Sequence, residues 1–192
     1  MAPVPATVFT DFTCPFSYVA EAALARVEDE GGIAASFRAF ELHPAPARLP
    51  LGGPDVDAVR PLADALGLEL RQPPLAARTR KAHELARFGE GKGLGRPLRA
   101  ALFAAYFGAG RDIGRIDVLV EIAAALGLDA TESRVVLDVD TFAAGVARDG
   151  AEARRLGIAG TPAILLGAAP DLRLVAGALS VDDLRALLAG AG

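Results

Sequence analysis

Cys14 is the only cysteine of this 192-residue chain, and its neighbours place it where a thiol can react. It stands in the run Thr-Cys-Pro-Phe-Ser-Tyr, residues 13–18, between a strand-like apolar segment and a helix-like one. Pro15 occupies the first position of the predicted helix, which proline favours. Because a helix start stabilises negative charge, this arrangement favours the thiolate, the nucleophilic form of cysteine. The alternative is a buried cysteine that only packs.

Ser17 occupies the position where a Cys-x-x-Cys redox motif carries its second cysteine. A dithiol enzyme releases its substrate when the second thiol attacks the mixed disulfide, and a serine cannot do this. The chain therefore has a single thiol, which must rely on an external thiol. Ser17 could instead donate a hydrogen bond to the sulfur, or it is simply a residue of the first helical turn.

The composition excludes several classes of function. The net charge of -4 gives no basic surface for nucleic acid, and no apolar run approaches the roughly 20 residues of a membrane span. One cysteine excludes a disulfide framework, and two histidines are too few for a histidine metal site. Residues 1–10 show no signal peptide. We expect a cytoplasmic protein with no metal, no membrane or nucleic-acid partner, and a monomeric or homodimeric state.

The order of predicted elements indicates an α/β fold with an all-helical insertion. A strand (6–12), a helix (15–29) and a second strand (33–42) form a βαβ unit, whose two strands should be parallel. A proline-rich loop follows. Helical patterns then cover 55–66, 76–89, 96–108, 116–126 and 131–137, the last with Thr131 as its N-cap. A helix (140–156), two antiparallel strands (163–166 and 171–176) and a helix capped by Ser180 (181–189) complete the chain. This predicts a discontinuous domain, 1–45 with 139–192, around an insertion at 46–138.

Several motifs together resemble one known family. They are residues 11–18 (Asp-Phe-Thr-Cys-Pro-Phe-Ser-Tyr), 40–44, 79–83, 105–107, 110–113 and 157–162 (Gly-Ile-Ala-Gly-Thr-Pro). Two of these motifs, about 150 residues apart, each lie in the expected context, and the chain resembles the DsbA family of the thioredoxin superfamily, in its FrnE-like branch. The resemblance implies a thioredoxin-like fold and thiol–disulfide chemistry.

The resemblance also implies roles for individual residues. Cys14 is then the nucleophile, with Ser17 assisting it, and Pro162 is a cis-proline. The backbone of Thr161 would pair with an extended peptide or with glutathione, and Pro15 and Phe16 would border the substrate. An ordinary turn proline at position 162 is the alternative.

Arg80 and His83 are further candidates, because they lie three residues apart on one face of a predicted helix. By resemblance this helix borders the cleft above the thiol, so both side chains would contact substrate. Arg80 belongs to a basic group with Arg78, Lys81 and Arg87, which would attract the carboxylates of glutathione. The competing interpretation is that this basic helix face is simply solvated.

Three functions follow as expectations. The first is a monothiol disulfide oxidoreductase of the DsbA/FrnE-like kind, with a thiol or disulfide substrate, no bound cofactor, and glutathione as a candidate co-substrate. The second is a glutathione-dependent isomerase or transferase that resembles 2-hydroxychromene-2-carboxylate isomerase or the kappa-class glutathione transferases. In those relatives a serine usually stands where Cys14 stands here. The third is a non-catalytic module that binds thiols or peptides.

Overall fold

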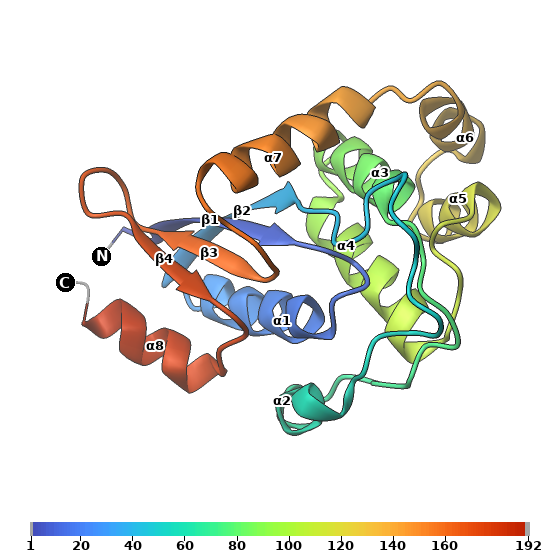
Figure 1. The fold of residues 1–192 in the computed structure, drawn as a ribbon. Coiled ribbons are helices and arrows are strands. Elements are labelled where there is room, and N and C mark those ends of the chain that lie inside the picture. Colours follow the sequence, from blue (N-terminus) through green and yellow to red (C-terminus); the bar gives the residue numbers. More distant parts are fainter. Residues whose placement is uncertain (1, 191–192) are drawn as a thin grey trace.

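The computed structural model describes residues 2–190, which form a mixed sheet covered by helices (Figure 1). The strands are β1 (Val4–Thr10), β2 (Ile33–Ala39), β3 (Ala163–Leu166) and β4 (Arg173–Ala176), arranged in the order β2-β1-β3-β4. As predicted, β1 and β2 are parallel, whereas β3 and β4 are antiparallel. Because β3 also runs antiparallel to β1, the end of β1 and the start of β3 lie at the same edge of the sheet.

Alternating side chains of β1 serve the two faces of the sheet. Val8 packs in a cluster with residues of α1 (Pro15–Asp29) and α8 (Val181–Ala189), while Phe9 packs with Ala153 of α7 (Ala143–Arg155). This is the two-residue period of a strand that is buried on both faces. In Figure 1, α1 and α8 accordingly lie on one side of the sheet and α7 on the other. The predicted α/β fold is confirmed.

The boundaries of α1 follow from its sequence. Pro15 begins the helix, as predicted, and the helix ends before Gly31, whose φ of 76° is a conformation that suits glycine. At the other end of the chain, Ser180 and Asp183 form a reciprocal capping box at the start of α8, which confirms the predicted cap.

Helices fill the segment between β2 and α7. They are η1 (Asp57–Val59), α2 (Arg60–Leu66), α3 (Arg80–Gly91), α4 (Gly95–Phe103), the π-helical turn η2 (Ala104–Gly108), α5 (Ile116–Ala125) and α6 (Ala130–Asp138). The apolar faces of α3, α4, η2, α5 and α6 share one core, which also contains Phe12 and Tyr18 from either side of Cys14, whereas η1 and α2 pack against Val19 of α1. The insertion therefore packs directly on the segment that carries the thiol. Its predicted limits, residues 46 and 138, remain a prediction.

Four local expectations were wrong. The second strand ends at Ala39 rather than at residue 42. The first strand ends at Thr10 rather than Phe12, because Asp11 turns away from the sheet and binds other segments through its side chain. Asp129, and not Thr131, is the N-cap of α6: its carboxylate accepts a hydrogen bond of 2.7 Å from the Glu132 amide. The single helix predicted over 96–108 changes to π-helical geometry at Ala104.

Asp149 of α7 joins the sheet to the insertion. This nearly buried carboxylate accepts a hydrogen bond of 3.0 Å from the amide of Ala39, at the end of β2, and an ion pair from Arg87 of α3. A buried carboxylate that has both an amide and a guanidinium partner is satisfied, and removing it leaves both partners unsatisfied. The position of α3 against the sheet therefore depends in part on this side chain.

His83 is buried inside the insertion rather than exposed on a helix face. Only 2% of the residue is exposed, and its ring lies 4.8 Å from the ring of Phe12, centroid to centroid. The Nε2 atom has no hydrogen-bond partner within residues 2–190. Burial lowers the pKa of His83 well below its ordinary value, and the charges of Arg99, Arg87 and Arg80 lower it further. The imidazole is therefore neutral in the folded protein.

We expect Asp149→Ala to lower the free energy of unfolding by about 3 kcal/mol, because it leaves Arg87 and the Ala39 amide unpaired in a nearly buried place. Urea denaturation followed by circular dichroism measures this loss. Asp57→Ala, which removes an exposed ion pair with Arg60, serves as the control and should leave the midpoint unchanged. Equal midpoints for both variants would contradict the assigned role of Asp149.

We also expect His83 to make folding weaker in acid. The unfolded chain takes up a proton near the ordinary histidine pKa of about 6.5, whereas the folded chain does not, so this contribution to stability falls as the pH drops below that value. The loss is at most about 1.4 kcal/mol per pH unit. In urea titrations between pH 7.5 and 5.5, His83→Gln should flatten the pH dependence and His43→Gln should retain it. The same slope in wild type and His83→Gln would contradict a neutral buried His83.

Candidate functional site

Cys14 lies between the end of β1 and the first turn of α1. It is the N-cap residue of α1, with an extended backbone (φ -90°, ψ 115°). Its amide donates a hydrogen bond of 3.0 Å to the Asp11 carbonyl, and its own carbonyl accepts one of 3.2 Å from the Tyr18 amide. Only 5% of the residue is exposed. The thiol is thus held at a helix start, just below the surface.

The Cys14 sulfur contacts the loop that precedes β3. Its Sγ lies 3.2 Å from the carbonyl oxygen of Thr161, a residue 147 positions away, and the thiol is the donor. The bond between Thr161 and Pro162 is cis. This contact joins the motif at residues 11–18 with the motif at residues 157–162. A protonated sulfur can donate to this carbonyl, whereas a thiolate has no hydrogen to donate.

Ser17 is fully buried one turn into α1. Its hydroxyl oxygen accepts a long hydrogen bond of 3.4 Å from the Asp11 amide. In this arrangement Ser17 supports the backbone that leads to Cys14. Direct assistance of the sulfur by this hydroxyl remains a prediction.

The remaining predicted substrate residues divide into two groups. Phe16 is partly exposed beside the thiol, whereas Pro15 is buried beneath it. Thr161 and Pro162 border an open cavity of about 320 Å³, which is lined by residues 157–163 and by Leu174, Ala176 and Gly177. The cavity lies along β4, at the sheet edge where Cys14 meets Thr161. His83 lines none of the cavities described below, because it is buried against Phe12.

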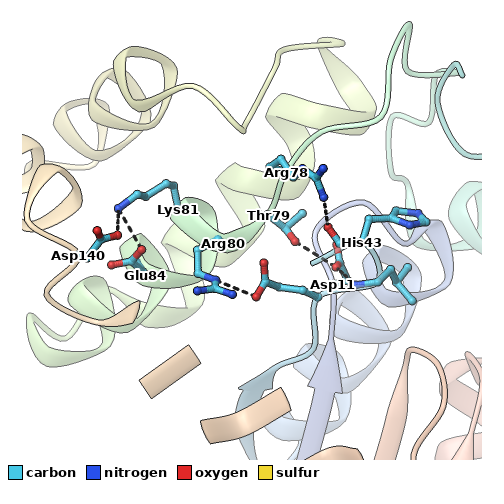
Figure 2. Close-up of polar contacts among 10 residues, drawn as sticks. Asp11, His43, Arg78, Thr79, Arg80, Lys81, Glu84 and Asp140 are labelled. Carbon is cyan, nitrogen blue, oxygen red and sulfur yellow. Dashed lines mark hydrogen bonds and ion pairs between the residues drawn. The ribbon is translucent and has the colours of Figure 1, made fainter. Parts of the chain in front are cut away.

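Asp11 is a residue that the sequence argument did not assign. Its fully buried carboxylate accepts hydrogen bonds of 2.7 Å from both the amide and the hydroxyl of Thr13, 2.7 Å from the amide of Leu42 and 3.1 Å from the hydroxyl of Thr79. Figure 2 shows Asp11 and Thr79 pointing toward one another across the gap between β1 and α3. Burial raises the pKa of the Asp11 carboxyl above its ordinary value, while these hydrogen bonds oppose the rise. The only signal in the sequence is an acidic residue three positions before the lone cysteine.

Arg99 of α4 supports the same loop from behind. It is 4% exposed, and it donates hydrogen bonds of 2.6 Å to the Thr10 hydroxyl and 2.8 Å to a Glu21 carboxylate oxygen. Its guanidinium carbon lies 5.0 Å from the centroid of the Phe12 ring. Arg99 also borders an apolar cavity of about 260 Å³ between α1 and α4, away from the thiol.

The basic residues predicted to attract an anion all have partners within the protein. Arg78 donates to the His43 carbonyl, Lys81 pairs with Asp140 and Glu84, and Arg87 pairs with Asp149 (Figure 2 shows the first two).

Arg80 keeps part of its guanidinium accessible. Its Nε donates to Glu41 at 2.8 Å, and the side chain is 38% exposed at a cavity of about 300 Å³. Arg154 of α7, which has no ion pair within residues 2–190, lines the same cavity. This cavity is where the structure brings two arginines together near the end of β2.

Within residues 2–190, His, Cys, Asp and Glu side chains form no group of three or more that could hold a metal ion. In the same residues no helix is both long enough and apolar enough to cross a membrane.

Comparisons with known proteins agree with this geometry. A sequence model of the DSBA-like thioredoxin domain matches residues 7–189. The uncharacterised protein YwbO of Bacillus subtilis is 28% identical over 144 residues, which are 70% of this chain and 72% of that one. The crystal structure of a probable DsbA oxidoreductase from Streptomyces coelicolor is 28% identical and superposes with a TM-score of 0.83, covering 98% of this chain and 89% of that one.

Two solved structures at 20% identity share the fold. The cytosolic disulfide reductase DsbM from Pseudomonas aeruginosa, solved with GSH, has a TM-score of 0.73 over 97% of this chain and 98% of that one. A 2-hydroxychromene-2-carboxylate isomerase has a TM-score of 0.75 over 98% of this chain and 94% of that one. The family match extends over nearly the whole chain and includes both the Cys14 turn and the Thr161–Pro162 loop, so this protein belongs to the DsbA-like thioredoxin domain family.

Proposed function

We propose that this protein is a monothiol disulfide oxidoreductase that uses Cys14 as its nucleophile and a small thiol such as glutathione to complete the cycle. The observation that carries this proposal is the contact between the Cys14 sulfur at the start of α1 and the Thr161 carbonyl. It places the lone thiol against Thr161, whose backbone segment lines an open cavity that suits a disulfide substrate. We place the reaction in the cytoplasm, where reduced thiols are abundant.

The proposed reaction has two exchange steps. Cys14 loses its proton to solvent, and its thiolate attacks one sulfur of a disulfide R–S–S–R′, forming Cys14–S–S–R and releasing R′–S⁻. Because Ser17 cannot attack this mixed disulfide, a glutathione thiolate does so, which restores the Cys14 thiolate and gives R–S–S–glutathione. No net oxidation occurs, since each step exchanges one disulfide for another.

Two observations support a small-thiol partner. The fold is shared with a disulfide reductase solved with GSH. The cavity that Arg80 and Arg154 line also offers guanidinium groups, which bind carboxylates well, and glutathione carries two carboxylates.

Intact-mass analysis after incubation with oxidised glutathione tests the first step. We expect one glutathione adduct on wild type and none on Cys14→Ala. With reduced glutathione present, wild type should turn over a small mixed disulfide, because the external thiol replaces the missing second cysteine.

Two results would count against this function. Absence of an adduct, together with tight binding of reduced glutathione that Cys14→Ala retains, would favour the isomerase or transferase chemistry of the structural relative. Absence of both adduct and turnover, with peptide binding retained, would indicate a binding module.

For the co-substrate, we expect Arg154→Ala to raise the KM for glutathione by about fivefold with little change in kcat, since it removes one charge-assisted contact to a carboxylate. This variant leaves the Arg80–Glu41 pair intact. Arg134→Ala, which removes the same charge from the exposed surface of α6, is the control and should leave the KM unchanged. An unchanged KM in Arg154→Ala, or an equal rise in both variants, would exclude this cavity as the glutathione site.

A further inference from the structure

Asp11 receives hydrogen bonds from three separate parts of the chain, and all of them converge near the nucleophile. Thr13 belongs to the turn that leads into Cys14, Leu42 lies 31 residues away beyond the end of β2, and Thr79 lies 68 residues away at the start of α3. We propose that Asp11 is a positioning residue for Cys14, and that its carboxylate clamps the turn 11–14 to β2 and to the helical insertion. This inference deepens the proposed function and rests on it.

The local half of the clamp shapes the turn itself. One carboxylate oxygen accepts from both the amide and the hydroxyl of Thr13, while the Cys14 amide returns to the Asp11 carbonyl. The side chain and the backbone of one residue thus fold the three residues before the sulfur into a closed turn.

The hydrogen bonds of Asp11 to Leu42 and Thr79 fix the position of that turn in the fold. The second oxygen accepts from the Leu42 amide and from the Thr79 hydroxyl, so it ties the turn to two segments that are distant in the sequence. Cys14 is thereby held in two ways: its sulfur contacts the Thr161 carbonyl, and the turn that leads to it is fixed by Asp11. Both must be kept for the thiol to meet a substrate bound along residues 157–163.

The chemistry of the side chain fits this role better than a packing role. A fully buried carboxylate is costly, and within residues 2–190 no lysine or arginine forms an ion pair with Asp11. All four of its partners donate, so the site requires a group that accepts on both oxygens. Asparagine has nearly the same shape but only one accepting oxygen, and its NH₂ group would face donors.

Loss of the Asp11 clamp should raise the rate at which Cys14 is alkylated and lower the rate of turnover. Only 5% of Cys14 is exposed, so a loosened turn makes its thiol more accessible to a small alkylating reagent. The same loosening moves the sulfur away from the substrate cavity and lowers turnover, because small displacements of a reacting group are costly. Loss of global stability alone moves neither rate while the protein stays folded.

The experiment compares the rate of iodoacetamide alkylation of Cys14 with kcat for glutathione-dependent turnover, at a temperature well below the melting temperature of each variant. We expect Asp11→Asn to raise the alkylation rate several-fold and to lower kcat by roughly 10- to 100-fold. Thr79→Val should move both rates in the same directions by less, and Thr79→Ser, which keeps the hydroxyl, should restore them. Leu184→Ala, a core change in the remote helix α8, is the destabilised control and should change neither rate.

A folded Asp11→Asn variant with wild-type kcat overturns the proposal, whatever its alkylation rate. If Asp11→Asn does not fold, the pair Thr79→Val and Thr79→Ser decides, and equal rates in these two overturn it. If wild type itself shows no turnover, the proposed function fails, and the alkylation rates alone decide whether Asp11 holds Cys14.

Discussion

The contact between the Cys14 sulfur and the Thr161 carbonyl is the constraint on which the arrangement of the site depends. It brings together the first and third strands of the sheet, the helix start and the loop with the cis bond at Pro162. The parallel β1–β2 pair and the antiparallel β3 are the elements that allow it, because they place the end of one strand beside the start of another.

The helical insertion acts as the support of the nucleophile's loop rather than as a separate lobe. Phe12 lies between His83 of α3 and Arg99 of α4, and Arg99 also reaches Thr10 at the end of β1. These residues pack against Phe12 and Thr10, so they contribute to the rigidity of the loop. Arg80 and His83 were both predicted to contact substrate. Arg80 is accessible at a cavity, whereas His83 is buried in the core.

The sequence predicted those features that depend on nearby residues. Helix α1 follows from Pro15 and Gly31, and α8 from its Ser180 cap, because helix ends are local. The lone thiol and the motif at Thr161–Pro162 also identified the family. The hydrogen bonds of Asp11 to Leu42 and Thr79, and the burial of His83 against Phe12, could not be predicted, because they arise when segments distant in sequence pack together. The prediction of Thr131 as the N-cap of α6 was wrong by two residues, because Asp129 and Thr131 both suit a cap and they lie two positions apart.

The recessed position of the only thiol has a consequence for its fate under oxidative stress. A peroxide that reached Cys14 would convert the thiolate to a sulfenic acid, and an unprotected sulfenic acid goes on to irreversible forms. Enzymes with two cysteines intercept the sulfenic acid by closing an internal disulfide, which this chain cannot do with Ser17. Burial of the sulfur against Thr161 then limits peroxide access, and rescue falls to a thiol from solution. In this chain the protection of the thiol against overoxidation is therefore steric rather than covalent.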